Sequence, residues 1–118
     1  MILYLTSNDH VNLLDFTETP HKRMVGLFML SQFVVRDMRN FSHCTRLILD
    51  RAAVSENDSD FIMTIEEFLV MYPARVTVLC EGLQPGTPLF QGLLNIGVGN
   101  IVTASAIEEM QDEIREVL

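Results

Sequence analysis

The chain has 118 residues, of which 48% are hydrophobic, enough apolar material for the core of one domain of ordinary size. Sixteen acidic residues against eight basic ones give a formal net charge of −8 at pH 7, which repels nucleic acid phosphates and anionic lipids, so we expect no nucleic acid partner. No apolar stretch reaches the roughly 18 residues that span a bilayer, and no basic leader precedes the first apolar residues, so we expect a cytoplasmic protein without membrane insertion.

The chain opens with a pattern typical of a buried strand. Residues 1–5 are apolar and are followed by the polar residues 6–9, so we predict a first strand and then a loop. Residues 11–16 have room only for a short helix before residues 17–20 interrupt the pattern.

Residues 24–29 admit two interpretations. They are either a second strand, weakened by Gly26, or part of a long helix that begins at Pro20. We favour the strand, because Ser31 is a suitable N-cap for a separate helix over residues 32–41. The predicted apolar stripe of that helix consists of Val34, Val35, Met38 and Phe41.

The clearest strand pattern lies in the middle of the chain. Residues 46–50 form a short apolar run that ends in Asp50, without the alternation of a surface strand, so we predict a central parallel strand whose last residue faces a cleft. The polar residues 55–60 can cap the next helix, which is predicted over residues 61–71 and stopped by Pro73. Its predicted core side consists of Phe61, Ile65, Phe68, Leu69 and Tyr72.

The last third of the chain continues the alternation. We predict a strand over residues 75–80, a helix that begins at the Thr-Pro pair 87–88 and ends at Gly97, and a short strand over residues 100–103. A capping box over residues 105–108 opens a final helix with an acidic outer face. Its predicted inward face consists of Ile107, Met110, Ile114, Val117 and Leu118.

About five alternations of strand and helix predict one α/β domain over residues 1–118, with a doubly wound parallel sheet between two layers of helices. The chain ends directly after its last helix, which leaves open that this domain is the N-terminal part of a longer protein.

The cysteines and histidines do not form a recognisable reactive site. Cys44 and Cys80 are predicted at opposite ends of neighbouring strands, a poor geometry for a disulfide, so we expect both to be reduced and buried. His10, His21 and His43 lack metal-ligand spacing, and no Gly-rich phosphate loop occurs. We therefore predict neither a metal, nor a cofactor, nor nucleotide hydrolysis.

Two features of the chain point to a known family. Asp50 closes the third predicted strand, and residues 97–105, Gly-Val-Gly-Asn-Ile-Val-Thr-Ala-Ser, are similar to a Gly-Ala-x-x-Tyr-Leu-x-Lys-Pro ending of a fifth strand. Over nearly its whole length the chain thus resembles the receiver domains of bacterial two-component signalling. The resemblance implies a three-layer, flavodoxin- and CheY-like (βα)5 fold with a five-stranded parallel sheet in the order 2-1-3-4-5. It places Asp50 on the phosphoacceptor and Cys80 on the switch threonine or serine.

The same resemblance indicates that the phosphorylation site is degenerate. The family's two metal-binding acids fall on or near Leu5 and Thr6, Asp9 lies two or more positions late, and the lysine position is Ala104. The only lysine of the chain is Lys22. The predicted degenerate pocket consists of Thr6, Asp9, Asp50, Cys80, Glu81, Thr103 and Ala104.

We therefore predict a non-catalytic pseudo-receiver domain for protein interaction, localisation or regulation. It is similar to the atypical receivers at the N-terminus of ParA/MinD-like ATPases of the pilus-assembly type. One alternative is a genuine phosphoacceptor receiver that uses Asp50 with an unusual metal shell, for which Asp9 and Glu81 are the available acids. Another is a flavodoxin-like small-ligand-binding domain that uses the loops after Leu5, Asp50 and Cys80.

The helix over residues 61–71 is too apolar to be covered by one face of a sheet. We predict that part of it forms an interaction surface, either in a homodimer or against a linked or partner ATPase domain. The candidate residues are Ile62, Met63, Val70 and Met71.

Overall fold

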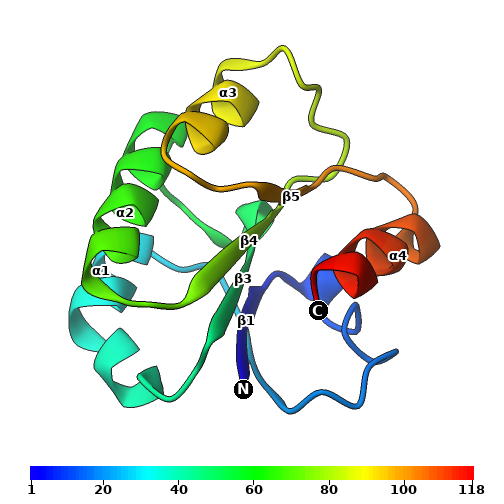
Figure 1. Ribbon diagram of the computed structural model, residues 1–118, viewed down its shortest axis with the longest axis horizontal. Helices are drawn as coiled ribbons and strands as arrows, with labels where there is room; N and C mark the ends of the chain where they lie inside the picture. The colour runs from blue at the N-terminus through cyan, green and yellow to red at the C-terminus, as the bar shows by residue number, and fades with distance from the viewer.

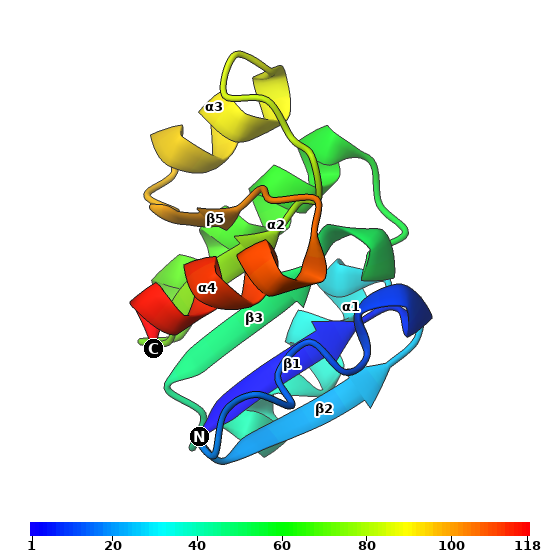
Figure 2. The ribbon, with the colours of Figure 1, turned by 90° about the vertical axis from the view of Figure 1, so that its right-hand side faces the viewer.

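A five-stranded parallel sheet lies at the centre of the computed structural model, which describes all of residues 1–118 (Figures 1 and 2). The order of the strands is β2-β1-β3-β4-β5. This confirms the predicted doubly wound, flavodoxin- and CheY-like α/β fold with the strand order 2-1-3-4-5. The strands are β1 (Ile2–Thr6), β2 (His21–Val25), β3 (Arg46–Asp50), β4 (Arg75–Leu79) and β5 (Asn100–Val102).

Helical segments cover both faces of the sheet. Three α-helices lie on one face and α4 lies on the other, together with the segment that joins β1 to β2 (Figure 1). The α-helices are α1 (Leu30–Arg36), α2 (Asp58–Met71), α3 (Pro88–Asn95) and α4 (Ile107–Val117). The short 3₁₀ helices are η1 (Asn8–His10), η2 (Met38–Phe41) and η3 (Arg51–Ala53).

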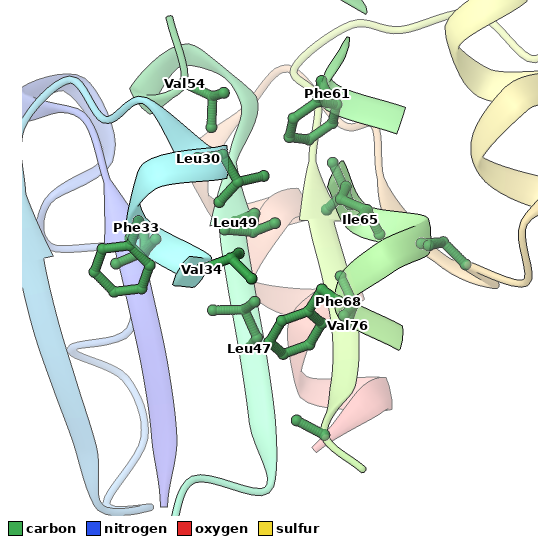
Figure 3. Packing of buried hydrophobic residues seen from close by; sticks show 14 of the residues in the cluster. Leu30, Phe33, Val34, Leu47, Leu49, Val54, Phe61, Ile65, Phe68 and Val76 are labelled. Carbon is green, nitrogen blue, oxygen red and sulfur yellow. The ribbon is translucent and has the colours of Figure 1, made fainter. Parts of the chain in front are cut away.

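The central strand β3 is buried on both faces and divides the core into two layers. Leu47 and Leu49 belong to the larger layer, under α1, α2 and α3, whereas Ile48 belongs to the smaller layer, under α4. Figure 3 shows Val34 of α1 and Phe68 of α2 packed over this strand. Burial on both faces explains why its sequence is a continuous apolar run and why its predicted bounds are confirmed.

No α-helix connects β1 to β2, so the short helix predicted over residues 11–16 is wrong. After η1 the chain continues in hydrogen-bonded turns to residue 16, and Leu13 and Leu14 pack on the sheet in place of a helical face. Residues 11–16 span less than two helical turns, so the packing of Leu13 and Leu14, and not a helical period, decides their conformation. The chain therefore has four α-helices around five strands.

The second strand was predicted too late in the sequence. β2 is an edge strand that pairs only with β1, and its exposed residues include Lys22 and Arg23. An edge strand of this kind lacks the apolar run from which buried strands are recognised, so the prediction of residues 24–29 captured only its last two residues. The alternative long helix beginning at Pro20 is also wrong.

The helix predicted over residues 32–41 is shorter and begins earlier. α1 ends at Arg36 and is followed by η2, and Ser31 lies inside its first turn instead of capping it. Val35 is 74% exposed and Phe33 takes its place in the core, because the helix is rotated relative to the predicted stripe. Both carboxylate oxygens of Glu56 accept hydrogen bonds at the N-terminus of α1, from the Leu30 N–H and, at 3.0 Å, from the Ser31 N–H.

The later elements agree more closely with the sequence patterns. Asn57 caps α2, which starts three residues before the predicted position, and Thr87 caps α3 with Pro88 at its first position. Gly97 has a φ of 98°, as its predicted place after α3 requires.

The predicted capping box of the last helix is wrong: Ala106 occupies the N-cap of α4 and no side chain caps it. Ile107 and Leu118 are exposed, whereas Met110 and Ile114 form the inward face of α4.

We expect Glu56→Ala to lower the free energy of unfolding by about 1 to 2 kcal/mol, because it removes both acceptors at the start of α1. Glu56→Gln keeps one acceptor oxygen, so its free energy of unfolding should lie between those of Glu56→Ala and the wild type. Urea denaturation followed by circular dichroism measures the difference. Glu67→Ala, an exposed glutamate in the middle of α2, is the matched control, and a loss as large as that of Glu56→Ala would contradict the capping role.

Candidate functional site

The side chain of Asp50 is buried at the carboxyl end of β3 and is surrounded by hydrogen-bonding groups. Its Oδ2 atom accepts from the Ser7 N–H at 3.0 Å and from the Ser7 hydroxyl at 2.6 Å, and it lies 2.8 Å from Nδ1 of His10. Its Oδ1 atom accepts from the Ala52 N–H at 3.1 Å. Because an ionised carboxylate can only accept, Nδ1 of His10 carries the proton of that contact.

The loop after β1 is held in place by β1 itself. The hydroxyl of Tyr4, which is fully buried, donates to the backbone carbonyl of His10 at 2.7 Å. Burial raises the pKa of Tyr4 well above its usual value, so this hydroxyl keeps its proton and remains a donor. The backbone of His10 is thereby anchored, and the imidazole lies against Asp50.

A hollow of about 300 Å³ lies beside this cluster and includes His10, Asp50, Cys80 and Glu81 in its lining. Nε2 of His10 lies 3.8 Å from Oε2 of Glu81, so the imidazole is placed between two carboxylates. The Ser7 hydroxyl donates to Asp50 and not to His10, so the three residues do not form a nucleophile activated by a histidine base.

Not all of the predicted pocket residues meet at this site. Cys80 and Glu81 line the hollow with Asp50, but the Thr6 hydroxyl donates to the Ser7 carbonyl at 2.9 Å and Asp9 is exposed.

The two predicted residues after β5, Thr103 and Ala104, form hydrogen bonds with groups other than Asp50. The Thr103 carbonyl accepts from the Gly82 N–H, and the Ala104 N–H donates to the Glu113 carboxylate at 3.1 Å. These bonds connect the segment after β5 to the segment after β4 and to α4.

Ser7 and His10 are the site residues that the sequence patterns missed. The predicted strand order contained a usable signal, since it places β1 beside β3 and brings polar residues that follow β1 to the carboxyl end of β3. Neither the spacing of the histidines nor the family pattern singles out His10, because its partner Asp50 lies forty residues away in the sequence.

The basic residues of the chain do not supply a free cation at Asp50. Lys22 is exposed on β2, with β1 between it and β3. The guanidinium of Arg51 donates to the Asp58 carboxylate at 2.9 Å and to the carbonyls of Val54 and Glu56 at 3.1 and 2.7 Å. No group of three or more His, Cys, Asp or Glu side chains is placed to hold a metal ion.

Both cysteines are free and buried, as predicted. Burial raises the pKa of the Cys80 thiol to about 12 and also raises the pKa of Cys44. A thiol that stays protonated is a poor nucleophile, so the position of Cys80 in the lining of the hollow does not make it reactive.

No helix of the chain combines the length and the apolar character needed to cross a membrane.

No family model matches the chain, and neither a curated protein nor a solved structure matches it significantly.

We expect Asp50→Ala to lower the free energy of unfolding by about 3 kcal/mol, because the N–H groups of Ser7 and Ala52 and the imidazole of His10 lose their acceptor. The exposed Asp9→Ala serves as the control and should change it by less than about 0.5 kcal/mol. Urea denaturation measures both. An increase in stability in Asp50→Ala, as is common when a strained catalytic acid is removed, would contradict a structural role for Asp50.

We expect Cys80 to react with iodoacetamide at pH 8 roughly a thousandfold more slowly than an unperturbed thiol, because its raised pKa leaves very little thiolate. Peptide mapping after timed alkylation distinguishes it from Cys44. The same chain in concentrated urea is the control, where both cysteines should react at ordinary rates. Rapid alkylation of Cys80 in the native chain would identify it as a reactive thiol and refute this assignment.

Proposed function

We propose that this chain is a non-catalytic pseudo-receiver domain that acts through protein–protein interaction. The observation that carries the proposal is the hydrogen bonding of the Asp50 carboxylate to Ser7, His10 and Ala52. Phosphorylation of an aspartate requires a carboxylate oxygen that is free to attack phosphorus. Here Oδ2 has three partners and is occupied, whereas Oδ1 accepts only the Ala52 N–H, so attack on phosphorus would have to come from Oδ1.

The residues around Asp50 also differ from those that phosphoryl transfer uses in a receiver. A receiver site needs a divalent ion held by carboxylates and a lysine against the phosphoryl oxygens. In this chain the residue packed on Asp50 is His10, and the residue at the lysine position of the family is Ala104. These substitutions support a site that maintains the fold without exchanging phosphoryl groups.

The loop after Asp50 is held in one conformation by several contacts. Arg51 bonds to Asp58 and to the loop carbonyls, and its guanidinium lies 4.6 Å from the centre of the Phe61 ring. Glu56 binds the first turn of α1, and a β-bridge joins Phe28 to Val54. Contacts of this density favour a rigid framework over a loop that switches position.

The outer face of α2 supports the interaction role. Met63, Val70 and Met71 are 55%, 86% and 57% exposed, and nothing else in the chain covers them. Ile62, the fourth predicted surface residue, is half-buried against α3, where a Cβ atom on Gly92 would lie 2.5 Å from its Cδ1 atom. We call the exposed face formed by Met63, Glu66, Glu67, Val70 and Met71 the α2 face.

One alternative has a specific observation in its favour. The hollow beside Asp50 lies at the carboxyl ends of β3 and β4, where α/β sheets bind small ligands. Since two carboxylates and an imidazole line it, a ligand there would be cationic or rich in hydrogen-bond donors.

Incubation with beryllofluoride and Mg²⁺, followed by amide NMR, tests the proposal. We expect no shift perturbations around Asp50, Cys80 and Thr103, because Oδ2 already contacts Ser7 and His10 and alanine stands at the lysine position of the family. Asp50→Asn is the matched control. Perturbations that occur in the wild type and vanish in this variant would refute the proposal in favour of a genuine phosphoacceptor.

A further inference from the structure

The α2 face combines exposed apolar side chains with acidic ones. Glu66, Glu67, Val70 and Met71 line a shallow depression of about 510 Å³ in the surface. Met63 lies seven residues, or two helical turns, before Val70, so the two side chains share one side of α2 with the glutamates between them. A partner would therefore contact apolar and acidic groups together.

The negative charge of this face is not neutralised within the chain. α2 contains four acidic residues and no basic ones, and only Asp58 forms an ion pair, with Arg51. Glu66 and Glu67 form none. The neighbouring helix α3 has no charged residue.

The single basic residue of the other neighbouring helix, α1, lies on the side of that helix away from α2. Val34 of α1 lines a small apolar space together with Ile65 and Phe68 of α2, so the side of α1 that carries Val34 faces α2. Arg36 follows two residues later and is therefore rotated by about 200° around the helix axis, away from α2. The carboxylates of the α2 face thus remain without a cationic neighbour from either flanking helix.

A second copy of the chain is a poor occupant of this face. A two-fold axis that pairs Met63 with Val70 of the other copy passes between Glu66 and Glu67. Such an axis brings four carboxylates together as the interface excludes water, and like charges in an interface disfavour association. The charge pattern favours a partner with the opposite sign.

We infer that the α2 face binds a basic amphipathic helical segment of another protein, with apolar side chains over Met63 and Val70 and Lys or Arg side chains against Glu66 and Glu67. This mode resembles the docking of an amphipathic helix through apolar residues spaced by whole turns. The inference rests on the proposed function, because it specifies the partner of the same surface. Charge complementarity supplies the specificity, and the exposed apolar residues supply the buried area.

The test uses two fluorescein-labelled helical peptides and the full chain. One peptide has leucines seven positions apart with lysines between them, and the other has glutamates in place of the lysines. We expect fluorescence anisotropy to detect binding of the basic peptide only. The double variant Glu66→Lys/Glu67→Lys should weaken this binding by about tenfold or more and should bind the acidic peptide instead. Val70→Gln should also weaken it.

The matched control is Glu109→Lys/Glu116→Lys, which makes the same change of charge on the exposed side of α4, on the opposite face of the sheet. This variant should bind the basic peptide within about twofold of the wild type, apart from a general charge effect that added salt removes. Circular dichroism confirms that each variant is folded. Equal binding of the two peptides, or equal weakening by both double variants, would overturn the inference.

Sedimentation equilibrium separates the remaining outcomes. A wild-type dimer that Val70→Glu dissociates would overturn the basic partner in favour of a second copy, while the proposed interaction role would stand. A monomer that binds the basic peptide supports the inference. A beryllofluoride response at Asp50 would refute the proposed function, whatever the peptides show.

Discussion

The hydrogen bonding of the Asp50 carboxylate is the constraint on which the carboxyl end of the sheet depends. A carboxylate that is 1% exposed is stable only when its lost hydration is replaced, and here Ser7, His10 and Ala52 replace it. These partners come from the loop after β1 and from η3. A single side chain therefore joins the end of β3 to the loop after the adjacent strand β1. This loop belongs to the connection between β1 and β2, which contains no α-helix.

The same hydrogen bonds favour a structural role for Asp50 over the reactive role that its position suggests. An acid at the end of a central parallel strand normally faces a ligand, because loops there diverge and leave a cleft. In this chain the loop after β1 is anchored by Tyr4 and turns inward, and His10 occupies the space beside the carboxylate. The remaining hollow contains two carboxylates, a histidine and a thiol whose pKa is raised by burial.

The two faces of α2 have different surroundings. Its inner face contributes Phe61, Ile65 and Phe68 to the larger core layer, whereas its outer face leaves apolar side chains in water beside uncompensated carboxylates. Neither feature stabilises the isolated chain. Exposed apolar area and unpaired like charge both become favourable when a complementary surface covers them, which is why the proposed function lies on this helix and not at Asp50.

Most of the fold could be predicted from the sequence, since buried strands and capped helices leave local patterns. The run that ends in Asp50, the start of α3 at Thr87 and the turn at Gly97 belong to this class. The position of β2 could not be predicted, because an edge strand needs no apolar run. The cap of α1 by Glu56 could not be predicted either, because a capping residue twenty-five positions away leaves no local signal. The local patterns predicted the parallel sheet and the place of Asp50 at the end of its central strand, and the family resemblance implied the strand order. The contacts of His10 and Ser7 with Asp50 became visible only in the folded chain, because they join segments about forty residues apart and depend on how one loop packs against one strand.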